Sequence, residues 1–312
     1  MGAGASFNPA SDIPNLTGRI ILVTGGSAGL GKQTIQYLAA HSPSRIYLAA
    51  RTPSKAESAI ASIREAVPDA PVEYLPLDLT SFSSIADAAR AFKEKEKRLD
   101  ILINNAGVMA MPYSLTKEGY EIQFGTNHMG HALLTKLLLP VLLETAKEPG
   151  ADVRIVNLSS MGHWGAPSGG IIWDQKVLEQ QYTFRRYGQS KLANVLFTKE
   201  LAARYPQITS VAVHPGVIIT DLYVSFRANP ISKIGLWVYQ LLTPILPGHF
   251  KDAKGGALTQ TWAATVPKER LENGAFYRPV GIKMSGSRYA QDAGLAKKLW
   301  EWTEAEFQKH GY

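Results

Sequence analysis

Short apolar segments alternate with helix-like segments along most of this chain. The expected strands cover residues 19–26, 45–51, 72–80, 99–107, 153–160 and 208–216. Expected helices follow the first five of them, at 29–40, 54–66, 81–97, about 118–145 and 185–205. Because these strands are apolar throughout, both faces of their sheet must be covered. The alternation predicts an α/β fold, a doubly wound Rossmann-type parallel β-sheet with helices on both faces.

The rest of the chain is expected to extend the same unit. An apolar helical stretch is expected at 231–247, a helix at about 253–265, a short strand at 274–279 and a final helix at about 292–309. Since no repeat, low-complexity tract or linker divides the chain, residues 1–312 are expected to form a single domain. Residues 1–16 are expected to be a flexible leader, and residues 221–256 to bind the substrate.

Composition excludes several kinds of site. The chain has no cysteine, which rules out disulfides, Cys-ligated metals and thiol nucleophiles. Its seven histidines are scattered without a ligand-like spacing, so no metal site is expected. The net charge of +7 favours an anionic partner, but the basic residues form no run or nucleic-acid-binding motif. A phosphate-bearing cofactor explains the charge better than a nucleic acid.

No segment offers the 18 uninterrupted apolar residues of a transmembrane helix, and no secretory signal begins the chain. We therefore expect a cytoplasmic protein. The first residues, "MGAGAS", fit the pattern for N-myristoylation in a eukaryote, although a flexible Gly/Ala leader is the simpler interpretation. One acyl chain would give only marginal membrane binding.

A glycine-rich turn, "VTGGSAGLGK" at 23–32, joins the first strand to the first helix. Gly25, Gly29 and Gly31 let the chain turn tightly and let its backbone approach a pyrophosphate. The helix N-terminus beyond them offers unpaired N–H groups and a partial positive charge. Glycines alone would be weak evidence, but the strand before and the helix after predict a dinucleotide site, which Ser27 and Leu30 would also line.

The end of the second strand predicts the cofactor's type. An acidic residue there would bind the ribose 2′-hydroxyl of NAD, but the chain has Arg51 instead. A guanidinium can bind a 2′-phosphate, which favours NADP(H) over NAD(H). The alternative is that Arg51 caps the surface or stacks on the adenine.

The pattern Tyr-x-x-x-Lys occurs twice, at Tyr113 with Lys117 and at Tyr187 with Lys191. The second pair lies on an amphipathic helix, where residues four apart share a face. A cation about 5 Å from the phenol, at an effective dielectric near 20, lowers the phenol's pKa by about two. This brings Tyr187 into the range of a proton donor and acceptor near neutral pH. Tyr113 lies in an expected loop and is interpreted as a surface or pocket-rim residue.

Six motifs in this order resemble the short-chain dehydrogenase/reductase family over about residues 17–220. They are the glycine turn, "NNAG" at 104–107, Asn127 in "NHMGHALLT", "IVNLSS" at 155–160, "YGQSK" at 187–191 and "HPGVIIT" at 214–220. The third and fifth look most like its retinol-dehydrogenase-like branch. In the same stretch, His128 and His131 are interpreted as packing or polar-surface residues.

The resemblance implies a role for each matching position. It implies a catalytic tetrad of Asn127, Ser160, Tyr187 and Lys191, with Ser160 preferred over Ser159 in the doublet. Tyr187 would be the acid–base group, Lys191 would also bind the nicotinamide ribose, Ser160 would bind the substrate oxygen, and Asn127 would link Lys191 to water. The remaining cofactor contacts would come from Asp78, Leu79, Asn104, Ala106, Gly107, Pro215, Gly216, Val217 and Thr220.

The segment after Thr220 is rich in Leu, Ile, Trp, Tyr and Phe, so the expected substrate is a lipophilic aldehyde, ketone or alcohol. The sequence does not choose among retinoids, steroids, long-chain aldehydes and polyketide ketones, nor does it fix the direction of the reaction. A non-catalytic NADP(H)-binding scaffold or redox sensor is the alternative. The family often forms dimers or tetramers, which leaves a homo-oligomer open.

Overall fold

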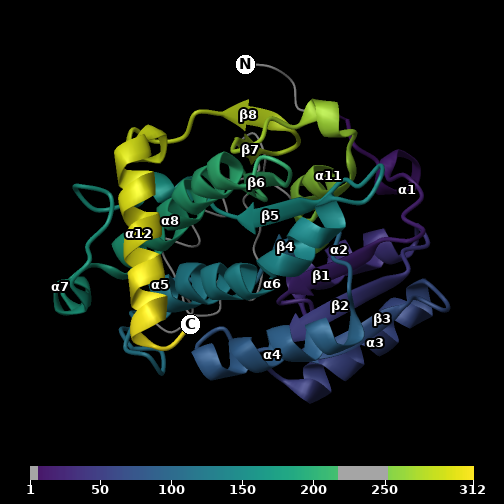
Figure 1. The fold of residues 1–312 in the computed structure, drawn as a ribbon, viewed down its shortest axis with the longest axis horizontal. Coiled ribbons are helices and arrows are strands. Elements are labelled where there is room, and N and C mark those ends of the chain that lie inside the picture. Colours follow the sequence, from purple (N-terminus) through teal and green to yellow (C-terminus); the bar gives the residue numbers. More distant parts are fainter. Residues whose placement is uncertain (1–5, 217–251) are drawn as a thin grey trace.

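The computed structural model describes residues 6–216 and 252–312 (Figure 1). The expected helix at 231–247 lies outside these ranges, as do Val217, Thr220 and all but the last five residues of the expected substrate segment 221–256. The described residues contain the glycine turn and all four expected catalytic residues.

In the described part of the chain, eight strands form one sheet in the order β3-β2-β1-β4-β5-β6-β7-β8. All neighbours from β3 to β7 are parallel, and β8 runs antiparallel to β7. The strands are β1 (Ile20–Thr24), β2 (Arg45–Ala50), β3 (Val72–Pro76), β4 (Ile101–Asn104), β5 (Arg154–Leu158), β6 (Thr209–Val213), β7 (Phe276–Arg278) and β8 (Ile282–Met284). The predicted parallel, doubly wound sheet is confirmed. Strand β8 was not predicted, because three residues with Lys283 at their centre give no clear pattern.

Helices flank the sheet on both sides (Figure 1). The longer ones are α2 (Gly29–Ala39), α3 (Pro53–Ala66), α4 (Phe82–Lys95), α6 (Gly130–Ala146), α8 (Thr183–Arg204), α11 (Leu258–Thr265) and α12 (Ala293–Lys309). Shorter elements are α1 (Pro9–Asp12), α5 (Ile122–Phe124), α7 (Gln175–Glu179), α10 (Ala253–Gly256) and the 3₁₀ turns η2 (Met161–Gly165), η5 (Lys268–Arg270) and η6 (Tyr289–Gln291). The long helix expected at about 118–145 starts only at Ile122 and contains a π-helical turn, η1 (Gly125–Met129).

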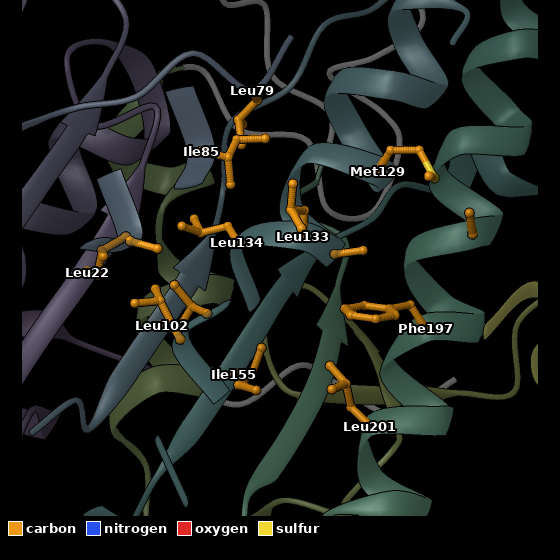
Figure 2. Close-up of a cluster of buried hydrophobic side chains, with 14 of the residues drawn as sticks. Leu22, Leu79, Ile85, Leu102, Met129, Leu133, Leu134, Ile155, Phe197 and Leu201 are labelled. Carbon is orange, nitrogen blue, oxygen red and sulfur yellow. The ribbon is translucent and has the colours of Figure 1, made fainter. Parts of the chain in front are cut away.

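Two hydrophobic cores lie on opposite faces of the sheet. Helices α2, α3 and α11 cover one face, where Ile35, Ile60 and Trp262 are buried. Helices α4, α6, α8 and α12 cover the other. Figure 2 shows the second core, in which strand residues face α4, α6 and α8; the labelled side chains are Leu22, Leu79, Ile85, Leu102, Met129, Leu133, Leu134, Ile155, Phe197 and Leu201. Because successive strand side chains alternate between faces, strands buried on both faces must be apolar throughout, as this sequence is.

Within the described residues, one helical stretch, Ile122–Ala146, is long and apolar enough to cross a membrane by length and composition. Its most apolar window is 56% buried in the structure. Leu133, Leu134 and Leu138 of this stretch are fully buried in the core between the sheet and the neighbouring helices. Packing against the sheet therefore accounts for its apolar composition.

The expectation of a flexible leader over residues 1–16 is wrong for residues 8–16. The Asn8 side chain caps helix α1 by accepting a hydrogen bond from the Ala10 N–H at 3.1 Å. Ile13 and Leu16 are each only 4% exposed and belong to the core that α2 and α11 cover. No periodic pattern marks this segment, because only two apolar side chains anchor it.

Candidate active site

The predicted site residues follow the carboxyl ends of neighbouring parallel strands. Strands β1, β2, β4, β5 and β6 are in register, so their last residues lie along one edge of the sheet. The glycine turn follows β1, Arg51 follows β2, "NNAG" begins at the end of β4, Ser160 follows β5 and Pro215 follows β6. Ligands of doubly wound sheets bind beyond this edge.

The glycine turn has the geometry of a phosphate cradle. Gly25 has φ +67° and Gly29 has φ +52°, a conformation that favours glycine. A Cβ on Gly31 would lie 2.4 Å from the Gly25 carbonyl oxygen, so only glycine allows α2 to approach the turn so closely. Ala28 at the N-cap position of α2 makes no side-chain capping bond. The first N–H groups of α2 are therefore available to a phosphate, with Ser27 and Leu30 half-buried beside them.

The residues after β2 and β3 differ in what they offer a cofactor. Arg51 is exposed at the end of β2. Beside the glycine turn and the start of α3, an open surface depression is lined by Ser27, Lys32, Ser54, Lys55, Ser58 and Ala59. The Asp78 side chain stabilises the turn in which it lies. One of its carboxylate oxygens accepts hydrogen bonds from the Thr80 N–H and hydroxyl, at 2.9 and 2.7 Å. Leu79 is buried in the core, which leaves its backbone, not its side chain, to meet a cofactor.

The "NNAG" segment corrects one expected contact. The Asn104 side chain is 1% exposed and donates to Asn157 at 2.8 Å and to Thr135 at 3.1 Å, so it joins strands β4 and β5 to α6. Asn104 and Asn157 are register partners, which turns the first Asn into the sheet. Ala106 and Gly107 are half-buried beyond the strand and are better placed to border a cofactor.

Helix α8 brings the predicted Tyr187 and Lys191 against the end of β5. Both are buried, at 7% and 5% exposure, and the Lys191 ammonium lies 5.8 Å from the centre of the Tyr187 ring. Lys191 Nζ donates to the Leu158 carbonyl at 3.1 Å. Burial lowers the pKa of Lys191 to about 8, which leaves it a cation at neutral pH.

The two serines after β5 have different surroundings. Ser159 is buried and its hydroxyl donates to the Lys191 backbone carbonyl at 2.7 Å, which ties β5 to α8. Ser160 is half-buried, and its hydroxyl oxygen accepts from the Gly162 N–H at 3.0 Å. That contact leaves the Ser160 O–H to donate to a substrate oxygen. This geometry is compatible with Ser160 in the predicted role, which stays a prediction.

Asn127 lies in the π-helical turn η1 and is fully buried. Its side-chain oxygen accepts from the Val108 N–H at 2.8 Å, and its amide donates to the Val108 carbonyl and to the Ser190 hydroxyl, both at 2.9 Å. A Cβ placed on Gly107 would lie 3.1 Å from Asn127 Oδ1 and 3.4 Å from Lys191 Nζ. Asn127 and Lys191 therefore border the same space beside Gly107.

Other predicted residues are placed at the edges of this site. Pro215 is half-buried and Gly216 has φ +96° just past β6. Tyr113 and Lys117 lie in a loop, as predicted. The Tyr113 hydroxyl donates to the Gln175 carbonyl at 3.2 Å, and its ring stacks on the Arg186 guanidinium.

Two glycines that sequence reasoning missed set the distance between η2 and α8. A Cβ on Gly188 would lie 2.7–2.8 Å from backbone atoms of Gly162, Gly165 and Ala166. A Cβ on Gly162 would lie 2.8 Å from Tyr187 Cε1 and 3.3 Å from Ser160 Oγ. Tyr187 Cε1 and Ser160 Oγ therefore border the same space beside Gly162. The sequence signal for Gly188 was the small residue inside "YGQSK". The reason for a glycine there is visible only once η2 and α8 pack together.

We expect Gly162→Ala to lower turnover about tenfold to a hundredfold while the protein stays folded, because the added methyl must displace the Tyr187 ring or the Ser160 loop. The control is Gly165→Ala in the same 3₁₀ turn, where a Cβ would find its nearest neighbour at 4.0 Å. Steady-state kinetics and thermal unfolding of both variants measure the effect. Equal turnover in the two variants would contradict the assigned contact.

Comparison with known proteins places this fold and site in one enzyme class. The family model for short chain dehydrogenases matches residues 19–230. Short-chain dehydrogenase/reductase drtF of Aspergillus calidoustus is 39% identical over 310 residues, covering 95% of this chain and 96% of its own. Retinol dehydrogenase 12 of Mus musculus is 38% identical over 288 residues, covering 91% and 85%. A solved structure of a putative uncharacterized protein from Mycobacterium paratuberculosis is 31% identical, covers 98% of both chains and has a TM-score of 0.73.

The chain belongs to the short-chain dehydrogenase/reductase family and resembles its retinol-dehydrogenase-like members. It is therefore an NAD(P)-dependent oxidoreductase acting on a small-molecule substrate, built on a fold that binds a nicotinamide cofactor.

Proposed function

We propose that this protein is an NADP(H)-dependent enzyme that reduces the carbonyl of a lipophilic substrate, or oxidises the corresponding alcohol. The observation that carries the proposal is that Ser160 Oγ and the Tyr187 ring border the same space beside Gly162, with the Lys191 cation one helical turn further along α8. A non-catalytic scaffold or redox sensor has no need of this arrangement.

The cofactor fits the residues present. The Gly25–Gly31 cradle and the uncapped start of α2 suit a pyrophosphate. The depression lined by Ser27, Lys32, Ser54 and Lys55 offers hydroxyl and ammonium donors at the start of α3, a few residues along the chain from Arg51, which suits a 2′-phosphate and favours NADP(H). Ala106, Gly107, Pro215 and Gly216 would border its nicotinamide half. When bound, the cofactor supplies or accepts the hydride.

The side chains then handle the proton. Ser160 donates a hydrogen bond to the substrate oxygen and holds it near Tyr187. Tyr187 gives its phenolic proton to that oxygen in reduction and takes it back in oxidation. Lys191, a buried cation below about pH 8, stabilises the phenolate that this transfer leaves. Asn127 keeps the space beside Lys191 open and ordered through its bonds to Val108 and Ser190.

We expect Arg51→Asp to shift the cofactor preference from NADPH towards NADH about tenfold to a hundredfold, because a carboxylate repels a 2′-phosphate and binds a 2′-hydroxyl. The ratio of kcat/KM for the two cofactors measures this shift. Arg90→Asp, an equal charge change on the exposed face of α4, is the control. An unchanged ratio in Arg51→Asp would contradict the assignment of Arg51 to the 2′-phosphate.

The substrate class rests on the apolar composition of the segment 221–256 and on the retinol named for the mouse relative. The test is NADPH oxidation with retinal, a ketosteroid, a long-chain aldehyde and an aromatic polyketide ketone, beside a small polar aldehyde. We expect turnover with at least one lipophilic carbonyl. Tight NADPH binding without turnover of any of them would favour the scaffold function instead. A cytoplasmic location and a single domain remain predictions.

A further inference from the structure

His131 lies in a position that the proposed chemistry does not use. It is 2% exposed, one helical turn after Asn127 at the start of α6. Its Nε2 is 2.8 Å from the Thr24 hydroxyl at the end of β1, and its Nδ1 is 3.0 Å from the Asn127 backbone carbonyl oxygen. The ring therefore bridges the glycine turn and the π-helical turn that carries Asn127.

The bonds of Thr24 determine which nitrogen of His131 carries the proton. The Thr24 hydroxyl oxygen accepts from the backbone N–H groups of Asn105 and Ala106, at 2.9 and 3.0 Å. A hydroxyl has two acceptor sites and one proton, so its own proton must be donated. His131 Nε2 at 2.8 Å is a much better acceptor than the Ile103 carbonyl at 3.5 Å. Nε2 is then the acceptor, and the proton on Nδ1 points at the Asn127 carbonyl.

The surroundings keep this ring neutral. Burial lowers the pKa of His131 to about 4, and the nearby Lys191 cation acts in the same direction. His128, the other titratable group close by, is itself fully buried with a lowered pKa. The hydrogen-bond chain therefore runs in one direction at neutral pH, from the N–H groups of Asn105 and Ala106 through Thr24 and His131 to Asn127.

Hydrogen bonds hold Asn127 at both its side chain and its backbone. Val108 and Ser190 fix its side chain, while His131 fixes its backbone carbonyl. Because Asn127 and Lys191 border one space beside Gly107, a rotation of the Asn127 peptide would change the surroundings of the Lys191 ammonium.

We propose that His131 is a positioning residue which, as the neutral Nδ1-protonated ring, holds the Asn127 carbonyl and so fixes the environment of Lys191. The proposal rests on the proposed function, since it assigns Lys191 to the cofactor and to Tyr187. A merely structural histidine would affect stability, whereas a positioning residue must also affect how the site responds to pH.

Three variants test the two hydrogen bonds of the His131 ring separately. His131→Asn keeps a donor where Nδ1 lies, His131→Gln keeps an acceptor near Nε2, and His131→Leu removes both. We expect kcat for NADPH-dependent carbonyl reduction to fall about tenfold to a hundredfold in His131→Gln and His131→Leu, with the apparent pKa of the pH profile displaced. His131→Asn should keep most of the turnover and the wild-type profile. Equal pH profiles in His131→Asn and His131→Gln would overturn the proposal, and this pair decides even where His131→Leu does not fold.

Two measurements need no substrate. The pH dependence of NADP⁺ binding, measured by calorimetry, should change in His131→Gln but not in His131→Asn. In the wild-type NADP⁺ complex, ¹⁵N NMR of the histidine rings should show His131 neutral with its proton on Nδ1 at pH 7. A proton on Nε2, or a charged ring, would overturn the proposal. If no carbonyl is turned over, the proposed function fails while these two results still decide the role of His131.

Discussion

Tyr187→Phe is expected to lower turnover about a thousandfold or more while leaving NADPH binding almost unchanged. The phenol is the group placed to exchange a proton with the substrate oxygen, and general acid–base catalysis contributes about 10²–10⁴ in rate. The ring itself packs against Gly162, so phenylalanine keeps the packing and removes only the hydroxyl. NADPH oxidation with the best carbonyl of the substrate panel measures turnover, and NADPH fluorescence measures binding.

The chain contains its own control for this experiment. Tyr113 also precedes a lysine by four residues, but its hydroxyl donates to the Gln175 carbonyl in a loop and its ring stacks on Arg186. Tyr113→Phe should therefore keep nearly all turnover. Near-wild-type turnover in a folded, cofactor-binding Tyr187→Phe protein would show that the acid–base assignment is wrong.

The fold was predictable because its signal is spread over many residues. Strands such as β1, β2 and β5 are apolar on both faces, which only a covered parallel sheet can bury. The parts that were missed are short: β8 has three residues, and the packed part of the leader depends on Ile13 and Leu16 alone. Elements of this size are fixed by tertiary contacts, not by a periodic pattern.

The site residues were predictable where a motif fixes both the type of a residue and its place relative to a strand or helix. Ser160 and Tyr187 follow from strand-end and helix patterns, and the structure brings both to Gly162. The sequence could not show that the Asn104 side chain faces the sheet, since only the register with Asn157 turns it there. His131 shows the same limit, because its two partners come from β1 and η1, 107 and 4 residues away.

Acidification from pH 7 to 5 is expected to lower the free energy of unfolding by roughly 6 kcal/mol. Burial lowers the pKa of His128 to about 3, and those of His131 and His214 to about 4, against 6.5 for an exposed ring. Because the folded pKa values are depressed, this stability is complete above pH 6.5 and is lost as the pH falls towards 4. Each ring contributes about 2 kcal/mol by pH 5, a large share of the 5–15 kcal/mol typical of a domain.

Two other buried groups test the sign of this expectation. Burial raises the pKa of Glu121, so that carboxyl stabilises the fold at low pH and partly offsets the histidines. Lys191 also has a lowered pKa, but its stability is already lost below about pH 8 and does not change between pH 7 and 5. Among the described residues, the buried histidines therefore outweigh the opposing carboxyl of Glu121 in this window.

Urea unfolding of the cofactor-free protein at pH 7, 6 and 5 measures the effect. His128→Gln removes one titrating ring from between Phe124 and Phe197, so it should lower stability at pH 7 yet reduce the loss between pH 7 and 5 by about 2 kcal/mol. His310→Gln, which replaces an exposed ring at the end of α12, should leave that loss unchanged. A stability that stays constant from pH 7 to 5, or an equal loss in all three proteins, would mean that these rings are not held neutral by the fold.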